Sequence, residues 1–126
     1  MENKVLLSIK PEFANKIFNG EKKFEYRRVI FKNKNVSKIV VYASSPVKKV
    51  IGEFDVGEII NTSKTELWNK TRKYSGITKD YFDKYFDDKE FGYAIEIKRV
   101  ERFDKPKCLN EEYGVSSPPQ SFVYLK

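Results

Sequence analysis

The segment 20–27 holds the residues whose types and spacing could do chemistry: Gly20, Lys22, Glu25 and Arg27. Glu25 and Arg27 are two positions apart, so on a strand their side chains lie on one face and can pair. Such a pair inside a cavity would fix the guanidinium for a phosphate or a nucleobase edge and leave Lys22 as a mobile cation. The alternative is a solvated strand face with an ordinary surface ion pair.

The missing residue types exclude several kinds of site. The chain has no histidine and one cysteine, Cys108, to which we assign no role. Without histidine there is no Ser-His-Asp or Cys-His catalysis, and a single cysteine excludes an internal disulfide and a Cys-clustered metal site. A carboxylate-only magnesium site stays open, although no Asp-x-Asp pattern appears. We therefore expect no metal and no cofactor, and any chemistry must use lysine, carboxylates, hydroxyls or backbone amides.

Length and composition predict one globular domain over residues 1–126. Of the residues, 40% are hydrophobic and 34% are charged, which is enough apolar material for a packed core. No apolar run approaches the ~20 residues of a membrane helix, and the start of the chain lacks the apolar stretch of a signal peptide. We expect a cytoplasmic protein without a membrane partner, and the sequence leaves its oligomeric state open.

The formal charge of +7 is unevenly distributed. Residues 1–50 carry 12 Lys and Arg against four Glu, whereas residues 51–126 carry 13 basic against 14 acidic side chains. This asymmetry indicates a basic face with a polyanionic partner such as nucleic acid. The alternative is a protein with a lysine-rich surface, since 20 of the 25 basic residues are lysine.

The elements that must position segment 20–27 can be predicted from local patterns. Val5–Ile9 reads as a short buried strand. Pro11 opens a helix, and Gly20 stands where a left-handed C-terminal cap belongs. After Gly20 the apolar period changes to two over Lys23–Arg27, which indicates a strand.

Further strands and helices follow along the chain. We expect strands over 39–43, 50–60 and 91–103, helices opened by Ser63 and Thr78, and a turn with a closing strand over 117–124. Gly52 and Gly57 indicate bulges, and the alternation slips near Lys98–Arg99. Long crossovers are few, so the prediction is an α+β fold: a small, mixed, mostly antiparallel β-barrel flanked by helices.

Several other side chains could reach a site beside segment 20–27. Lys10, Ser44, Ser45 and Lys48 are candidate ligand contacts, with solvated or turn roles as the alternatives. Gln120 and Ser121 follow a Pro-Pro turn and could supply base-edge hydrogen bonds. The aromatic residues Trp68, Tyr74, Tyr81 and Tyr85 could stack on bases, but their helical spacing favours a core stripe, so Trp68 is the one to test.

Gly20, Lys22, Glu25 and Arg27 reproduce Gly-x-Lys-x-x-Glu-x-Arg, the signature of the ASCH domain family in the PUA-like superfamily. The resemblance extends over nearly the whole chain. It includes the segments 7–11, 42–46, 51–54 and 118–122, which look like those of small stand-alone bacterial and archaeal ASCH proteins.

This resemblance implies a PUA-like β-barrel with flanking helices and a cleft beside the signature strand. It also implies recognition of RNA or a modified nucleotide, because related PUA, YTH and EVE domains bind RNA or modified bases. The expected basic cleft is lined by Lys22, Glu25 and Arg27, with support from Lys10, Ser44, Ser45 and Lys48.

Two enzymatic alternatives accompany binding, and whether the protein is an enzyme stays open. Some ASCH proteins are ribonucleases, and here Lys22 could stabilise the phosphorane, Arg27 could hold the phosphate and Glu25 could accept the 2′-OH proton. Others are amidohydrolases of acylated cytidine, but that branch places a threonine nucleophile where this chain has Glu25. Its downstream glutamate matches Glu90 or Glu96 only by rough position.

Overall fold

The computed structural model describes residues 3–125. The elements are, in order, β1 (Asn3–Ile9), α1 (Pro11–Phe18), β2 (Phe24–Arg27), β3 (Val36–Ala43), β4 (Lys49–Ser63), α2 (Lys64–Thr71), η1 (Arg72–Tyr74), α3 (Lys79–Tyr85), β5 (Phe91–Lys107), α4 (Leu109–Tyr113) and β6 (Val123–Leu125). The strands and helices predicted from local patterns are present, with β5 running four residues past its expected end. The five-residue helix α4 was not expected.

The six strands form one sheet in the order β2-β5-β4-β3-β1-β6. The β1/β3 pair is parallel and the other four pairs are antiparallel, so the prediction of a mixed, mostly antiparallel sheet is confirmed. The edge strands β2 and β6 have four and three residues, and no pairing joins them within residues 3–125. The described sheet is therefore open, and the closed barrel that we expected is not confirmed.

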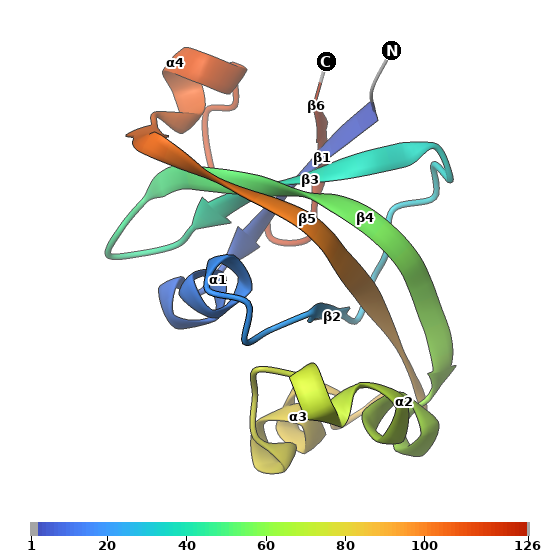
Figure 1. Cartoon of the computed structure of the whole chain (residues 1–126). Helices are drawn as coiled ribbons and strands as arrows, with labels where there is room; N and C mark the ends of the chain where they lie inside the picture. The colour runs from blue at the N-terminus through green and yellow to red at the C-terminus, as the bar shows by residue number, and fades with distance from the viewer. Residues whose placement is uncertain (1–2, 126) are drawn as a thin grey trace.

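Bulges give β4 and β5 their strong bend, which Figure 1 shows as two long curved ribbons. Val56 pairs with Ile97 and Phe54 with Val100, so β5 carries one extra residue at the predicted slip near Lys98–Arg99. A second irregularity, between Val56 and Ile59, contains Gly57. Because a bulge increases local twist, these two sites bend the strand pair toward α2 and α3.

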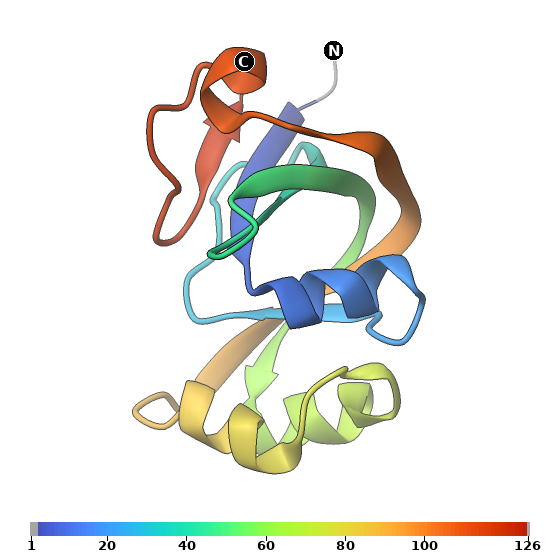
Figure 2. The same ribbon diagram turned by 90° about the vertical axis from the view of Figure 1, so that its left-hand side faces the viewer.

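Alternation along β1 and β3 separates two apolar clusters on opposite faces of the sheet. Val5, Leu7 and Ile9 pack in one cluster together with Ala14 and Ile17 of α1. Leu6 points to the other face, where Leu109 of α4 covers it. A third cluster holds α2 and α3 against β2 and β5. In Figure 2, α1 lies between the curved strands and the α2–α3 pair.

Capping side chains fix where the later helices begin. Ser63 accepts a hydrogen bond from the backbone N–H of Glu66 at 3.3 Å, and Thr78 accepts one from Tyr81 at 3.1 Å. Both caps were predicted from sequence. Among the helices of residues 3–125, none is long and apolar enough to cross a membrane.

Candidate functional site

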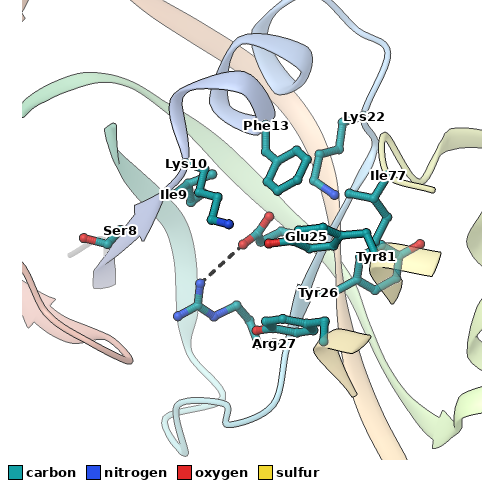
Figure 3. A pocket seen from close by; sticks show the side chains of 11 residues that line it. Ser8, Ile9, Lys10, Phe13, Lys22, Glu25, Tyr26, Arg27, Ile77 and Tyr81 are labelled. Atoms are coloured by element: carbon teal, nitrogen blue, oxygen red, sulfur yellow. Dashed lines mark hydrogen bonds and ion pairs between the residues drawn. The ribbon is translucent and has the colours of Figure 1, made fainter. Parts of the chain in front are cut away.

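Segment 20–27 lies beside a cavity of about 160 Å³, which we call the signature cavity (Figure 3). Three parts of the chain surround it: the end of β1 with the start of α1, the approach to β2 with β2 itself, and α3 with the turn before it. Its lining residues are Ser8, Ile9, Lys10, Phe13, Lys22, Glu25, Tyr26, Arg27, Ile77, Tyr81 and Tyr85.

Local backbone chemistry brings these parts together. Pro11 starts α1 directly after Lys10, and Gly20 has φ of +88°, which lets the chain turn sharply toward β2. β2 then pairs with β5 from Phe24 to Arg27, and this pairing fixes the direction of alternate side chains. The predicted left-handed turn at Gly20 is confirmed.

Lys22 is buried, with 2% of its surface exposed. Its Nζ donates a hydrogen bond to the Ser75 carbonyl oxygen at 2.7 Å and lies 4.8 Å from the ring centroid of Tyr26. Burial lowers the pKa of Lys22 to about 8, and the neighbouring charge of Glu25 acts in the opposite direction. The expectation of a mobile cation is therefore wrong, because the turn after η1 covers this side chain and fixes its head group.

Glu25 and Arg27 form the ion pair that their spacing predicted. Arg27 Nη1 lies 3.3 Å from Glu25 Oε2, and the two side chains are 12% and 9% exposed. Arg27 Nη2 also donates to the Ser121 carbonyl oxygen at 2.7 Å, which ties β2 to the C-terminal segment. The guanidinium is therefore held from two sides in a partly desolvated place, unlike an ordinary surface pair.

Tyrosine rings supply much of the cavity wall. The Tyr26 hydroxyl lies 2.6 Å from the hydroxyl of Thr71, which donates its own proton to the Leu67 carbonyl oxygen, so Tyr26 is the donor. Burial raises the pKa of Tyr26 to about 12. Tyr81 lies beneath the Lys10 ammonium, with Nζ 5.2 Å from the ring centroid.

The structure brings together some predicted site residues and separates others. Lys10, Lys22, Glu25 and Arg27 all line the signature cavity. Ser44, Ser45 and Lys48 do not: they lie in the turn after β3, where the backbone N–H of Ser44 bonds to the Ile9 carbonyl oxygen. Ser44 and Ser45 therefore have the turn role that the sequence analysis gave as the alternative to ligand contact.

Sequence reasoning missed part of the aromatic wall. Tyr81 and Tyr85 line the cavity. Tyr85 also packs against the third core cluster, and Trp68 packs on Phe82 with ring centroids 5.0 Å apart, so the predicted core role is confirmed for these two. The four-residue spacing does place both tyrosines on one face of α3, which was the available signal. It does not distinguish a core from a cavity, because both accept aromatic rings.

The presence of two buried charges together distinguishes the signature cavity from the others, since Lys22 alone also lines a cavity beside Tyr74 and Glu96. A larger cavity of about 890 Å³ lies between segment 30–37 and the bend of β4. Lys22 and Glu25 are the buried charged side chains of the described chain, and both line the signature cavity. Within residues 3–125 no cluster of His, Cys, Asp and Glu could hold a metal ion.

Residues 3–117 match the family model described as a domain of unknown function, DUF365. The large ribosomal subunit protein uL22 of Ureaplasma parvum is 33% identical over 97% of this chain, which spans only 39% of that protein. An ASCH domain-containing ribonuclease from Zymomonas mobilis is 29% identical, and the match covers 96% of this chain and 83% of the relative. The crystal structure of an ASCH protein from Zymomonas mobilis superposes with a TM-score of 0.90 at 28% identity, covering 98% of this chain and 87% of that chain.

Proposed function

The chain belongs to the DUF365 family and is an ASCH domain protein, and on that premise we propose that its signature cavity binds RNA or a modified nucleotide. The observation that carries the proposal is the convergence of Lys22, Glu25 and Arg27 in one cavity beside tyrosine rings. The Zymomonas mobilis relative is named a ribonuclease, which supports RNA as the partner.

The cavity offers the groups that nucleotide recognition needs. Tyr81 and Tyr85 present ring surfaces on which an unpaired base can stack. Glu25 can accept a hydrogen bond from a base N–H, while Lys10 and Arg27 can donate to a phosphate or a carbonyl edge. Figure 3 shows the head groups of these three residues directed toward one another. Ser44, Ser45 and Lys48 take no part in the proposal, because they do not line the cavity.

Arg27 provides the test of binding. Replacing it with alanine removes the fixed guanidinium, so the affinity for a fluorescein-labelled single-stranded RNA should fall about tenfold or more. Fluorescence anisotropy measures the affinity, and thermal melting shows that the variant folds. Arg99→Ala is the matched control, since the Arg99 side chain is 89% exposed and does not line the cavity. Equal affinities of Arg27→Ala and the parent would overturn the proposal.

A ribonuclease activity at the same cavity is the second candidate, favoured by the named relative. In this reaction Glu25 accepts the proton of the 2′-OH, whose oxygen attacks phosphorus. The P–O5′ bond breaks to leave a 2′,3′-cyclic phosphate, the 5′-oxygen takes a proton from water and leaves as a hydroxyl, and Glu25 returns its proton to solvent. Arg27 holds the phosphate, and the Lys22 ammonium stabilises the added negative charge. Because its pKa is about 8, Lys22 is mostly protonated at neutral pH, as this role requires.

Turnover separates the enzyme from the binding module. The parent protein is incubated with labelled RNA and with acylated cytidine, with and without a chelator, beside Lys22→Ala and Glu25→Gln. A ribonuclease of this kind gives cyclic phosphate ends with or without chelator, and both variants lose the activity. Deacylation of acylated cytidine would instead favour the amidohydrolase alternative. If no turnover occurs, both enzymatic candidates are wrong, and the binding proposal is decided by the affinity of Arg27→Ala alone.

A further inference from the structure

A second cavity adjoins the signature cavity and shares two of its walls. We call it the flanking cavity; its volume is about 350 Å³, and Arg27, Arg28, Val29, Tyr85, Lys89, Gln120 and Ser121 line it. Arg27 and Tyr85 line both cavities. A ligand in the signature cavity can therefore continue past these two side chains into the flanking cavity.

Both cavities are basic, but they differ in their acidic groups. The signature cavity holds the carboxylate of Glu25 beside three basic side chains, whereas the flanking cavity is lined by three basic side chains and no acidic one. Arg28 does have an acidic partner, Asp88, but that carboxylate is 70% exposed and does not line the cavity. The flanking cavity therefore suits an anion, while the signature cavity suits a group that can donate hydrogen bonds to Glu25.

The shared side chains are suited to a nucleotide strand. Arg27 is fixed between Glu25 on one side and the Ser121 carbonyl oxygen on the other, so it stands at the junction of the cavities. Burial raises the pKa of Tyr85, so this ring stays a neutral stacking surface at physiological pH. Base-stacking rings next to basic side chains match the alternation of bases and phosphates along a single strand.

We infer that the ligand is single-stranded RNA of at least two nucleotides, with one nucleotide in the signature cavity and the adjoining phosphodiester in the flanking cavity on Arg28 and Lys89. This inference rests on the proposed function and narrows it. A free nucleoside would leave the flanking cavity unused, whereas an RNA strand uses both. Gln120, which also lines the flanking cavity, can hydrogen-bond the sugar of the flanking nucleotide.

The test compares ligands of different length on matched charge variants. The parent binds a dinucleotide of RNA more tightly than a nucleoside when both compete against a labelled single-stranded RNA. In Arg28→Ala/Lys89→Ala the dinucleotide affinity falls roughly five- to tenfold, and the salt slope falls by about 0.7 as one phosphate contact is lost. The affinity for the nucleoside stays unchanged, because these side chains do not line the signature cavity.

Two further variants complete the test: one is a charge-matched control, and the other is expected to raise the affinity for the dinucleotide. Arg99→Ala/Lys105→Ala removes the same net charge from exposed positions that line neither cavity, and it should bind like the parent. Asp88→Asn frees Arg28 from its acidic partner, so it should bind the dinucleotide more tightly. An equal loss in both double variants would show a general charge effect and overturn the inference.

Failure of the inference is distinguishable from failure of the proposed function. If Arg28→Ala/Lys89→Ala keeps the parent's dinucleotide affinity and salt slope while Arg27→Ala weakens binding, the flanking cavity is not used and the proposed function stands. If Arg27→Ala also binds like the parent, both are overturned.

Discussion

At the scale of single residues, Lys22 is a charged side chain whose burial is unfavourable in free energy. Its Nζ donates to the Ser75 carbonyl oxygen and lies over the rings of Phe13 and Tyr26, and within residues 3–125 Lys22 forms no ion pair. Taking an ammonium out of water without a carboxylate partner disfavours the charged form, which is why its pKa falls to about 8. Because burying this lysine costs free energy, its presence indicates a role other than stability.

Because burial lowers the pKa of Lys22, the free energy of unfolding depends on pH. The pKa of Lys22 is 10.5 in the unfolded chain and about 8 in the fold. Between these values the unfolded state binds more protons, so the free energy of unfolding rises with pH, by up to about 1.4 kcal/mol per unit. Tyr26 acts oppositely above pH 10, because its pKa rises from 10.0 to about 12 in the fold.

Lys22→Met is expected to abolish this rise. At pH 7 the variant should be as stable as the parent or up to ~2 kcal/mol more stable, because an apolar chain of similar length replaces a buried charge. Urea unfolding of both proteins at intervals from pH 7 to 10 measures the difference. The parent should gain stability across this window and the variant should stay flat. Parallel curves for the two proteins would contradict the assignment of the low pKa to Lys22.

At the scale of elements, the turn between η1 and α3 holds Lys22 in place. Gly76 has φ of +69°, and a Cβ built there would lie 2.6 Å from the Lys22 Cβ. The Lys16 ammonium donates to the Gly76 carbonyl oxygen at 3.2 Å, so α1 fixes the same turn. Neither the conformation nor the space at this position accepts a side chain.

Gly76→Ala should therefore destabilise the protein by about 2 kcal/mol or more, through the strained φ and the contact with Lys22. It should also displace the Lys22 head group and weaken RNA binding beyond the loss of folded protein. Gly114→Ala is the matched control: its φ is +67°, but apart from its chain neighbours no atom of the described residues lies within 4 Å of an added Cβ, so the cost is the backbone strain alone. Urea unfolding and anisotropy measure the two effects. Equal losses in the two variants would show that packing on Lys22 contributes nothing.

What the sequence could predict is what short-range patterns encode. The cap at Thr78, the turn at Gly20 and the bulge near Lys98–Arg99 each depend on residues within a few positions, and all three are confirmed. The pairing of Glu25 with Arg27 follows likewise from strand alternation. These local rules placed β2 and its charged face.

Burial of Lys22 and closure of the sheet depend on distant segments. Lys22 is covered by Ser75, 53 positions away, and no pattern near either residue indicates that contact. Whether β2 meets β6 is decided by the curvature of the whole sheet, so local alternation could not distinguish an open sheet from a barrel. For the same reason, helical spacing could not show that Tyr81 and Tyr85 face a cavity.

At the scale of the whole molecule, the excess of positive charge in residues 1–50 lies in the part that supplies most of the two cavities. Lys10, Lys22, Arg27 and Arg28 come from this part, and Lys89 comes from the remainder. A net charge of +7 also attracts RNA at every exposed lysine, without any cavity. The two modes of attraction differ in how they depend on RNA length.

The salt dependence of binding distinguishes localised from diffuse attraction. Each phosphate contact with a single strand contributes about −0.7 to the slope of log affinity against log salt. A ligand held in the signature and flanking cavities makes about two such contacts, so the slope should reach about −1.4 at two or three nucleotides and then stay constant. Anisotropy with single-stranded RNA of two to twelve nucleotides, from about 50 to 200 mM salt, measures the slope. Diffuse attraction would instead add phosphate contacts with every nucleotide, so a slope that steepens steadily to the longest RNA would contradict localised binding.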